Sequence, residues 1–361
     1  MKIVADPNIP FVLEAFGPLG HVVLVPGRTM TAHDVRDADC LLVRSVTAVN
    51  AALLEGSRVR FVATATIGTD HVDTAYLAGR GIGFASAAGS NANSVAEYVV
   101  AALLELAHRK NFRLRDKTLG VVGVGNVGSK VVRYAEALGM RVLQNDPPRQ
   151  RSEGLNHFVS LERVLTEADI VTLHVPLTRT GTDATYHLFE PRRGIIINTA
   201  RGAVLDNRAL LQAPLEGLVL DVWENEPDLL PGLLQKTDIG TPHIAGYSFD
   251  GKVNGTRMIY EATCSFFGLM PNWQPQLPPP PVPKVELDAT GLAEEEALRR
   301  VVSSVYDITA DDRALRAAPH QFDRLRAEYP VRREFFNTAV LLRNAPEQLR
   351  QMCAALGFKL Q

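Results

Sequence analysis

The chain has 361 residues, and its 38 Lys+Arg against 40 Asp+Glu give a net charge of −2. Hydrophobic residues make up 46% and charged residues 22%, which is ordinary for a globular protein. The charge balance argues against a general nucleic-acid or membrane-surface binder, because such proteins carry an excess of Lys and Arg. The 3 cysteines are widely spaced without a C-x-x-C pattern, which argues against a disulfide framework or a zinc cluster and favours a reducing compartment. With no apolar signal region at the N-terminus and no apolar run of membrane-spanning length, we expect a cytoplasmic protein.

Short apolar runs alternate with helix-like segments through residues 1–90, which predicts a small α/β unit. Asn50–Leu54 and Thr74–Leu77 are predicted to be helical. Ser94 and Glu97 have the spacing of a capping box, so a long apolar helix is expected to open there and run to about His108. The predicted strands are partly β-branched, as buried parallel strands are; they are Ile3–Ala5, Val22–Val25, Cys40–Val43, Phe61–Ala65 and Ile82–Ala85.

The same alternation continues through residues 118–245 and predicts a doubly wound parallel sheet. A helical pattern returns over Gly255–Leu269, where a helix could cross back to the first unit. The strands expected in this second unit are Leu119–Val124, Arg141–Asn145, Ile170–Val175, Ile195–Thr199, Leu218–Val222 and Ile239–Thr241.

A proline-rich segment separates the last part of the chain. Pro271–Pro283 holds 7 prolines in 13 residues, which predicts a semi-rigid extended linker, with a ligand for a proline-binding partner domain as the alternative. Residues 284–361 are expected to form a small α+β unit that gains stability by packing on another subunit. In it, Lys284–Leu287 and Val301–Ile308 flank a charged helix, and further helices lie near Phe322–Arg326 and Ala345–Leu356.

A glycine pattern, G-x-G-x-x-G, directly follows the predicted strand 119–124 and precedes a helical pattern. Such a loop lets backbone N–H groups approach a pyrophosphate at a helix N-terminus. The residues expected to bind the dinucleotide here are Gly123, Gly125, Asn126, Val127 and Gly128. Asp146 ends the next strand, 18 residues after Gly128, where its carboxylate would bind a ribose 2′-OH and favour NAD over NADP. Arg149 and Arg151 weaken that preference, and a methyltransferase that uses S-adenosylmethionine would share the loop.

Three polar segments follow predicted strand ends, where doubly wound sheets bind their ligands. His243 suits a general base, because imidazole titrates near neutrality. Glu226 would fix its tautomer and favour the imidazolium, and the planar guanidinium of Arg201 would bind a carboxylate. The segments are residues 198–203, 221–227 and 241–246. Taken singly, a surface ion pair, a solvated acid and a strand-end histidine explain these residues, but their occurrence together favours hydride-transfer chemistry.

The glycine loop, together with residues 199–202, 220–224 and 242–246, resembles the D-2-hydroxyacid dehydrogenases over roughly residues 1–270. The resemblance implies an NAD-binding Rossmann domain (93–255) inserted into a flavodoxin-like substrate domain (1–92 and 256–280). It also implies Arg201, Glu226 and His243 as the catalytic trio and Asp221 as a contact of the nicotinamide carboxamide. Further expected NAD contacts are Thr199, Ala200, Gly246 and Val175, the last through its backbone only, because close relatives favour Thr there.

Residues 43–47, 63–71, 243–247 and 305–307 resemble one branch of that family over essentially the whole chain. The resemblance implies a small phosphorylated 2-hydroxy acid as substrate and a homodimer formed through a C-terminal domain, residues 281–361. Ser45, Thr66 and Tyr247 would contact the substrate. Arg44 has the charge of a phosphate ligand, and a structural ion pair explains it equally well.

Two loops, residues 187–194 and 210–221, are shorter than the family pattern, so either they are trimmed or residues are missing from the sequence. Asp70, His71 and Asp73 have the side chains of metal ligands but lack a convincing fourth partner, so no metal is expected. His174 is expected to be structural. The alternative functions are a dehydrogenase for another 2-hydroxy acid, such as 3-phosphoglycerate, and a non-catalytic NAD(H)-sensing scaffold.

Overall fold

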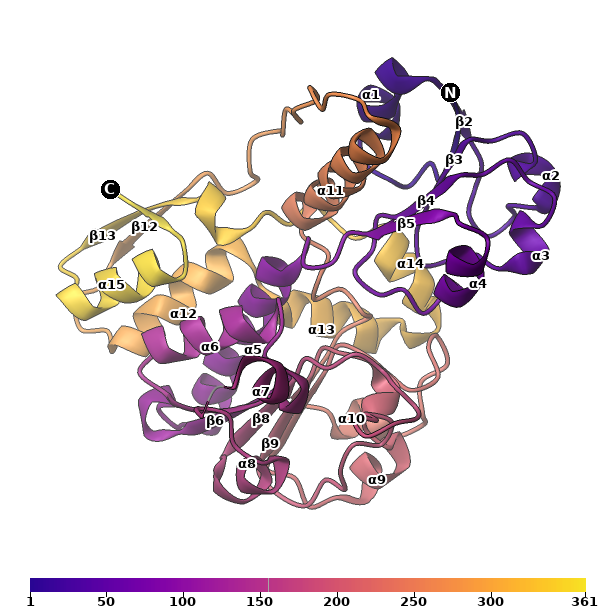
Figure 1. Ribbon diagram of the computed structural model, residues 1–361. Coiled ribbons are helices and arrows are strands. Elements are labelled where there is room, and N and C mark those ends of the chain that lie inside the picture. The colour runs from indigo at the N-terminus through magenta and orange to yellow at the C-terminus, as the bar shows by residue number, and fades with distance from the viewer. Residues whose placement is uncertain (155) are drawn as a thin grey trace. The chain divides into compact units, whose positions relative to one another are not determined.

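The computed structural model describes residues 1–154 and 156–361; Leu155, inside the predicted NAD-binding domain, lies outside the described residues. The chain divides into two compact units. The first unit joins Met1–Asn91 to Phe249–Pro278, and the second joins Ala92–Ser248 to Pro279–Gln361 (Figure 1). Within the described residues, no helix combines the length and the apolar character that a membrane span requires.

The first unit is built on a parallel sheet with the strand order β2-β1-β3-β4-β5, the flavodoxin-like order. Every residue of β3 and β4 is buried, and all of them except Thr64 at the end of β4 are apolar, as expected of strands covered on both faces. The strands are β1 (Lys2–Ala5), β2 (His21–Leu24), β3 (Cys40–Val43), β4 (Phe61–Thr64) and β5 (Gly83–Ser86). The helices are α1 (Val12–Phe16), α2 (Ala32–Val35), α3 (Ala51–Leu54), α4 (Thr74–Gly79) and α11 (Phe249–Phe267).

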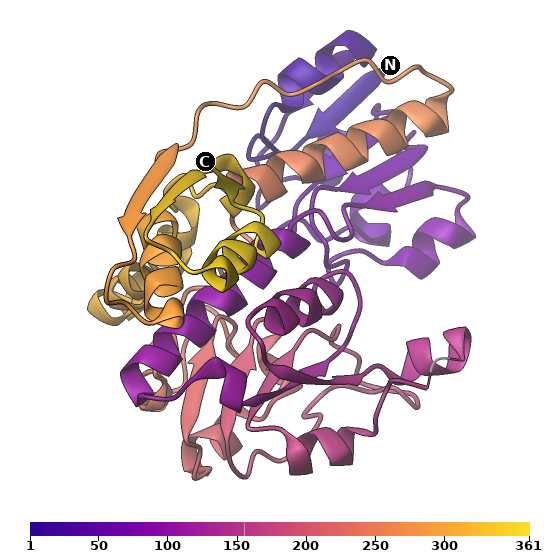
Figure 2. The ribbon, with the colours of Figure 1, turned by 90° about the vertical axis from the view of Figure 1, so that its left-hand side faces the viewer.

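Helix α11 packs on this sheet, as Figure 2 shows, and buries Ile259, Tyr260 and Cys264 in the same core as strand residues of β1 and β3. It begins at Phe249, six residues before the start expected from the sequence. Gly251 and Gly255 lower the helix propensity of these first turns, which hides them from a pattern-based prediction.

The second unit contains a parallel sheet with the order β11-β10-β9-β8-β6-β7. The chain runs from β6 outward to β7 and then returns to β8 on the other side, so the switch point lies at the carboxyl ends of β6 and β8. The strands are β6 (Thr118–Val122), β7 (Arg141–Asn145), β8 (Ile170–Leu173), β9 (Ile195–Asn198), β10 (Gly217–Leu220) and β11 (Ile239–Gly240). The helices are α5 (Ala92–Lys110), α6 (Gly128–Ala137), α7 (Pro147–Glu153), α8 (Leu161–Glu167), α9 (Asn207–Gln212) and α10 (Leu233–Lys236). The strands predicted for both sheets are confirmed to within two residues at each end.

The crossover from β8 to β9, residues 174–194, is described without any helix. Two of its backbone N–H groups instead bond the loop that follows β9: His187 donates to the carbonyl of Ala203 at 3.0 Å and Leu188 to that of Val204 at 2.8 Å. This crossover includes the 187–194 segment that the sequence marks as short.

The C-terminal part of the second unit holds a small parallel sheet with the order β12-β13-β14. The prediction of a non-helical flank at Val301–Ile308 is wrong, because this stretch ends one helix and begins the next. Its valines are β-branched but fall at helical spacing, with Leu298, Val301 and Val302 buried together. The strands are β12 (Lys284–Asp288), β13 (Ala339–Arg343) and β14 (Lys359–Leu360); the helices are α12 (Glu294–Val305), α13 (Ile308–Ala317), α14 (Phe322–Ala327) and α15 (Glu347–Ala355).

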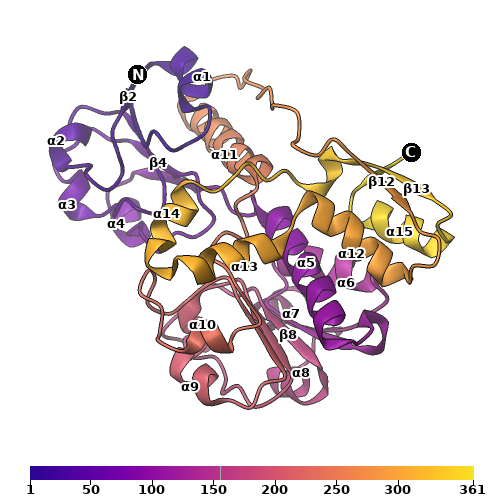
Figure 3. The same ribbon diagram turned by 180° about the vertical axis from the view of Figure 1, so that it is seen from behind.

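Helices α12 and α13 follow one another along α5 in Figure 3. Leu298 of α12 and Ile308 of α13 belong to the same hydrophobic core as Leu103 of α5 and Val121 of β6. The C-terminal residues and the nucleotide-binding sheet therefore share one core. That residues 284–361 also pack on another subunit stays a prediction.

Gly202 allows a close approach between the loops after β9 and β10. A Cβ atom at this position would lie 2.0 Å from the carbonyl carbon of Trp223. We expect Gly202→Ala to lower the free energy of unfolding by about 1–3 kcal/mol, because backbone must move to make room. Urea denaturation measures this. Gly79→Ala is the control, since no atom lies within 4 Å of the added carbon; an equal loss in both variants would contradict the steric explanation.

Candidate active site

The glycine loop between β6 and α6 has the close contacts that its pattern predicts. A Cβ at Gly128 would lie 2.0 Å from the carbonyl oxygen of Gly123. Gly123 itself has a φ of +84°, and a Cβ there would lie 2.8 Å from the carbonyl of His174 in the adjacent crossover. At Gly125 nothing lies within 4 Å, so this side of the loop is open to a ligand. The arrangement fits a pyrophosphate over the N-terminus of α6.

Asp146 holds the glycine loop from the end of β7. One carboxylate oxygen accepts the N–H of Val124 at 2.8 Å, and the other accepts the N–H of Arg149 at 3.0 Å. Each oxygen keeps a further lone pair for a ribose hydroxyl. The Arg149 side chain pairs with Glu153 at 2.7 Å, and Arg151 pairs with Asp183. Carboxylates therefore neutralise both arginines that the sequence places near a 2′-phosphate.

The loops after β9, β10 and β11 carry Arg201, Glu226 and His243, so the predicted trio lies along one edge of the sheet on neighbouring strands. His243 Nδ1 and Glu226 Oε2 lie 2.7 Å apart, and Glu226 Oε1 accepts the N–H of Trp223 at 2.8 Å. Burial raises the pKa of Glu226, but the hydrogen bond and the charge of His243 outweigh it, and the pKa lies below its usual value. Because Nδ1 is engaged, a substrate proton would move through Nε2 of His243.

The loop that carries His243 is wrapped around Asp221. The buried Asp221 carboxylate accepts the Thr241 hydroxyl and the N–H of Ile244, both at 2.7 Å, and the N–H of Ala245 at 3.0 Å. Burial raises the pKa of this carboxyl. From the sequence, Asp221 was predicted only as a nicotinamide contact. Its hydrogen bonds to the loop that carries His243 were not predicted, since backbone donors leave no signal in a sequence.

Hydrogen bonds from its neighbours on the loop after β9 orient Arg201. The side-chain amide of Asn198 donates to the carbonyl of Arg201 at 3.0 Å, and its oxygen accepts the N–H of Ala200 at the same distance. One guanidinium nitrogen of Arg201 donates to the carbonyl of Ala200 at 2.8 Å. Asn198, which sequence reasoning did not single out, thus shapes the turn that presents Arg201.

His174 lies between two threonines, as expected of a structural residue. Its ring nitrogens lie 3.0 Å from the hydroxyl of Thr172 and 3.2 Å from that of Thr199. Burial lowers the pKa of His174 to about 3, so the ring is neutral at ordinary pH. Thr199, predicted to bind the cofactor, bonds His174 in the structure, and a Cγ of Val175 lies 2.9 Å from where Gly123 would carry a Cβ.

The predicted substrate residues fall in both units. Ser45, Thr66 and Arg44 belong to the first unit, and Tyr247 belongs to the second. The Thr66 hydroxyl lies 2.7 Å from that of Thr64 and donates to the carbonyl of Gly68 at 3.1 Å. These hydrogen bonds fix the orientation of the Thr66 side chain.

Of the three residues with metal-ligand side chains near the end of β4, His71 and Asp73 make local hydrogen bonds. His71 bonds the hydroxyl of Thr64 at 3.0 Å, and Asp73 accepts the N–H of Tyr76 at the start of α4. Among the described residues a different group, His187, Asp206 and Glu224, brings potential metal-ligand atoms within 4.8 Å of one another.

That second group borders a cavity of about 300 Å³, but hydrogen bonds within the protein account for it. His187 Nε2 lies 2.9 Å from Glu224 Oε1, whose other oxygen accepts the N–H of Asn207 at 3.2 Å. Asp206 caps α9 by accepting the N–H groups of Arg208 and Ala209.

Comparison with known proteins identifies the family. A model described as the NAD-binding domain of D-isomer-specific 2-hydroxyacid dehydrogenases matches residues 82–245. The chain is 50% identical to an erythronate-4-phosphate dehydrogenase of Edwardsiella ictaluri over 99% of both chains, and 49% identical to that of Salinibacter ruber over 92% of both. The chain belongs to the D-isomer-specific 2-hydroxyacid dehydrogenases. A second model, a domain of unknown function (DUF3410), matches residues 276–357.

Solved structures agree with the predicted fold class. An Aquifex aeolicus D-lactate dehydrogenase, complexed with NAD and lactic acid, matches 74% of this chain and 96% of its own at 25% identity and a TM-score of 0.60. An NAD-bound 3-phosphoglycerate dehydrogenase of Entamoeba histolytica matches 74% and 95% at 26% identity and a TM-score of 0.62. The predicted doubly wound NAD domain, parallel-sheet substrate domain and small α+β tail are confirmed, and so is NAD as the cofactor.

The relatives bear on the length of the chain. The match to the Edwardsiella protein extends over 379 aligned residues, more than the 361 of this chain, so the relative has residues without a counterpart here. That these fall at 187–194 and 210–221 stays a prediction.

We expect Asp146→Asn to raise the KM for NAD about tenfold or more and to narrow the preference for NAD over NADP, because a charged acceptor is lost and a 2′-phosphate is no longer repelled. Initial rates with both nucleotides measure the change. Glu136→Gln, which removes an exposed carboxylate on α6, is the control. An unchanged ratio of the two kcat/KM values in Asp146→Asn would contradict the role of Asp146.

Proposed function

We propose that this chain oxidises 4-phospho-D-erythronate to (3R)-3-hydroxy-2-oxo-4-phosphooxybutanoate with NAD, a step in pyridoxal 5′-phosphate (vitamin B6) biosynthesis. The near-full-length identity of 50% to an erythronate-4-phosphate dehydrogenase supports the substrate. The observation that carries the chemistry is the 2.7 Å pair of His243 and Glu226 on the sheet that also bears the glycine loop. A base held by a carboxylate is what alcohol oxidation requires.

The residues divide the reaction between them. NAD supplies the acceptor for the hydride that leaves C2 of the substrate. Nε2 of His243 takes the hydroxyl proton, so that the C2–O bond becomes a carbonyl. Glu226 stabilises the imidazolium that results, and Arg201 holds the C1 carboxylate and the C2 oxygen. The glycine loop, Asp146 and Asp221 are assigned to NAD, together with Val175, Thr199, Ala200 and Gly246.

Ser45, Thr66 and Tyr247 are assigned as substrate contacts, and Arg44 is assigned as the ligand of the substrate phosphate. The hydroxyls and the guanidinium supply the donors that a phosphorylated acid needs.

Residues 281–361 are assigned to a homodimer contact. Phe336 and Leu360, which are 44% and 38% exposed, support this assignment because a second copy would cover them. The free, buried Cys40, Cys264 and Cys353 suit a reducing cytoplasm.

We expect His243→Ala to lower kcat by a factor of about 10²–10⁴, because the general base is lost, while NAD binding persists. NADH absorbance gives kcat, and fluorescence titration gives the Kd of NADH. His320→Ala, which removes an exposed imidazole, is the control. Near-normal turnover by His243→Ala would refute its role as the base.

We expect Glu226→Gln to lower kcat, because a neutral amide cannot stabilise the imidazolium that forms when His243 takes the hydroxyl proton. The measurement is kcat for 4-phospho-D-erythronate at saturating NAD, with the Kd of NADH measured in parallel. An unchanged kcat would show that Glu226 does not act through His243.

The substrate itself is tested by assaying 4-phospho-D-erythronate beside 3-phosphoglycerate, with NAD and NADP in parallel. We expect kcat/KM to favour 4-phospho-D-erythronate. A preference for 3-phosphoglycerate would assign another dehydrogenase activity, and no turnover of any 2-hydroxy acid would favour a nucleotide-sensing scaffold.

A further inference from the structure

The loop that carries His243 begins at the open edge of the nucleotide-binding sheet. We call residues 240–248 the base loop. Strand β11, which leads into it, is the edge strand and comprises only Ile239–Gly240. On its inner side, Thr241 N–H donates to the carbonyl of Leu220 on β10 at 2.9 Å. The N–H of Gly240 belongs to the opposite side, where an edge strand has no neighbour.

Helix α13 supplies the missing partner at the start of the base loop. Asp312 Oδ1 accepts the N–H of Gly240 at 2.7 Å, and Asp312 is 5% exposed. Arg316, one turn further along α13, bonds both oxygens of Asp312 at 3.0 Å. Its guanidinium also donates to the carbonyls of Leu234 and Thr237, at 2.8 and 2.6 Å, in the turn before β11.

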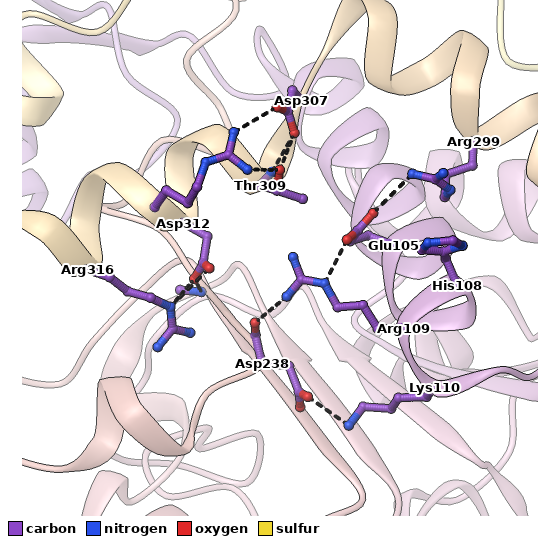
Figure 4. A network of polar contacts seen from close by, with 12 residues as sticks. Glu105, His108, Arg109, Lys110, Asp238, Arg299, Asp307, Thr309, Asp312 and Arg316 are labelled. Carbon is purple, nitrogen blue, oxygen red and sulfur yellow. Dashed lines mark hydrogen bonds and ion pairs between the residues drawn. The ribbon is translucent and has the colours of Figure 1, made fainter.

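Figure 4 shows this contact between Asp312 and Arg316 beside a second set of ion pairs at the base of β11. Asp238, the residue before the strand, pairs with Lys110 of α5 at 2.7 Å. Arg109 donates to the carbonyl of Asp238 at 2.9 Å. The short strand is therefore held by α5 at its beginning and by α13 at its end.

The C-terminal residues also bond the end of the base loop. The hydroxyl of Ser248 donates to Glu334 at 2.8 Å, and Glu334 accepts the side-chain amide of Asn93 on α5 at 2.9 Å. Arg332 donates to the carbonyl of Ala245 at 3.4 Å. All of these polar groups except Asn93 belong to buried residues, so none of the bonds is readily exchanged for one to water.

Ser94 also bonds this end of the base loop, and its role differs from the one predicted from the sequence. The predicted capping box at Ser94 and Glu97 is wrong, because α5 begins at Ala92 and both residues lie inside it. The Ser94 hydroxyl donates to the carbonyl of Ala245 at 2.8 Å and accepts the N–H of Ser248 at 3.1 Å. Glu97 accepts the N–H of Phe335 at 2.8 Å, which ties the C-terminal segment to α5.

The base loop needs such support because its backbone is strained at His243, the proposed general base. His243 has a φ of +56°, in the left-handed region, which costs a residue other than glycine about 1–2 kcal/mol. A conformation of this kind persists only where the surroundings determine it. Relaxation at His243 would turn the imidazole away from its place, and a displacement of about 1 Å in a reacting group can lower a rate about 100-fold.

We propose that residues 308–335, which lie in the matched domain of unknown function, are a positioning element that holds the base loop and thereby His243. Asp312 and Arg316 fix the start of the loop, and Arg332 and Glu334 fix its end. Asp312 is a positioning residue that acts through the backbone of Gly240. The proposal rests on the proposed function in one respect, the role of His243 as the base.

The test uses the full-length protein and compares Asp312→Ala with two other variants. Asp312→Asn keeps an oxygen that can accept the N–H of Gly240. Asp307→Ala removes the N-terminal cap of α13, where Asp307 accepts the N–H of Thr309 at 3.0 Å, and makes no contact with the base loop among the described residues. It therefore destabilises the same helix by about 1 kcal/mol without touching the loop.

We expect Asp312→Ala to lower kcat for 4-phospho-D-erythronate at least about tenfold while the Kd of NADH and the oligomeric state are unchanged, because the base is misplaced and the glycine loop is not. Asp312→Asn should recover most of the rate. Asp307→Ala should lower the Tm and leave kcat within twofold of the unaltered protein.

Turnover by the unaltered protein tests the proposed function first, so the variants test positioning alone. A kcat of Asp312→Ala within twofold of the unaltered protein, an equal loss of kcat in Asp307→Ala, or a loss that follows dissociation into monomers would each overturn the proposal.

Ser248→Ala gives a second measurement at the other end of the loop if Asp312→Ala does not fold. It should lower kcat at unchanged Kd for NADH, with the exposed Ser304→Ala as control. Normal kcat in Ser248→Ala would equally overturn the proposal.

Discussion

The arrangement of the active site depends on the buried carboxylate of Asp221. A charge without solvent is costly unless hydrogen bonds surround it. Here its donors are the hydroxyl of Thr241 and the N–H groups of Ile244 and Ala245, which all belong to the base loop. If the loop moved away, the carboxylate would lose these three donors. The electrostatic requirement of Asp221 therefore fixes the path of the chain on either side of His243.

The same strand end also fixes the carboxylate that faces the base. Glu226 lies five residues after Asp221, and between them the N–H of Trp223 donates to Glu226 at 2.8 Å. The indole of Trp223 donates to the carbonyl of Thr241 at 3.0 Å, so the loops after β10 and β11 are joined a second time. Gly202 lets the loop after β9 approach the Trp223 backbone. The trio thus stands on loops that hold one another, which limits the movement of each catalytic side chain.

Local features of the site were predictable from the sequence, and its long-range contacts were not. Cys40–Val43 is a strand at the predicted bounds, since all of its residues are buried and apolar, as in other buried parallel strands. Ser94 was misinterpreted because its spacing to Glu97 imitates a helix cap, while its real partners, Ala245 and Ser248, lie more than 150 residues away. No local pattern distinguishes the two uses of a serine.

Asp312 shows what such a long-range contact leaves in a sequence. It lies on α13 between the buried Ile308 and Leu315, on the apolar side of an amphipathic helix, where an acidic residue needs a partner. The sequence therefore indicates that the Asp312 carboxylate accepts a hydrogen bond, but it does not identify the donor. Because the C-terminal helices share one core with α5 and the sheet, that donor is found within the same subunit. A tail of this size would be marginally stable alone, and the packing that stabilises it brings Asp312 to the open edge of β11.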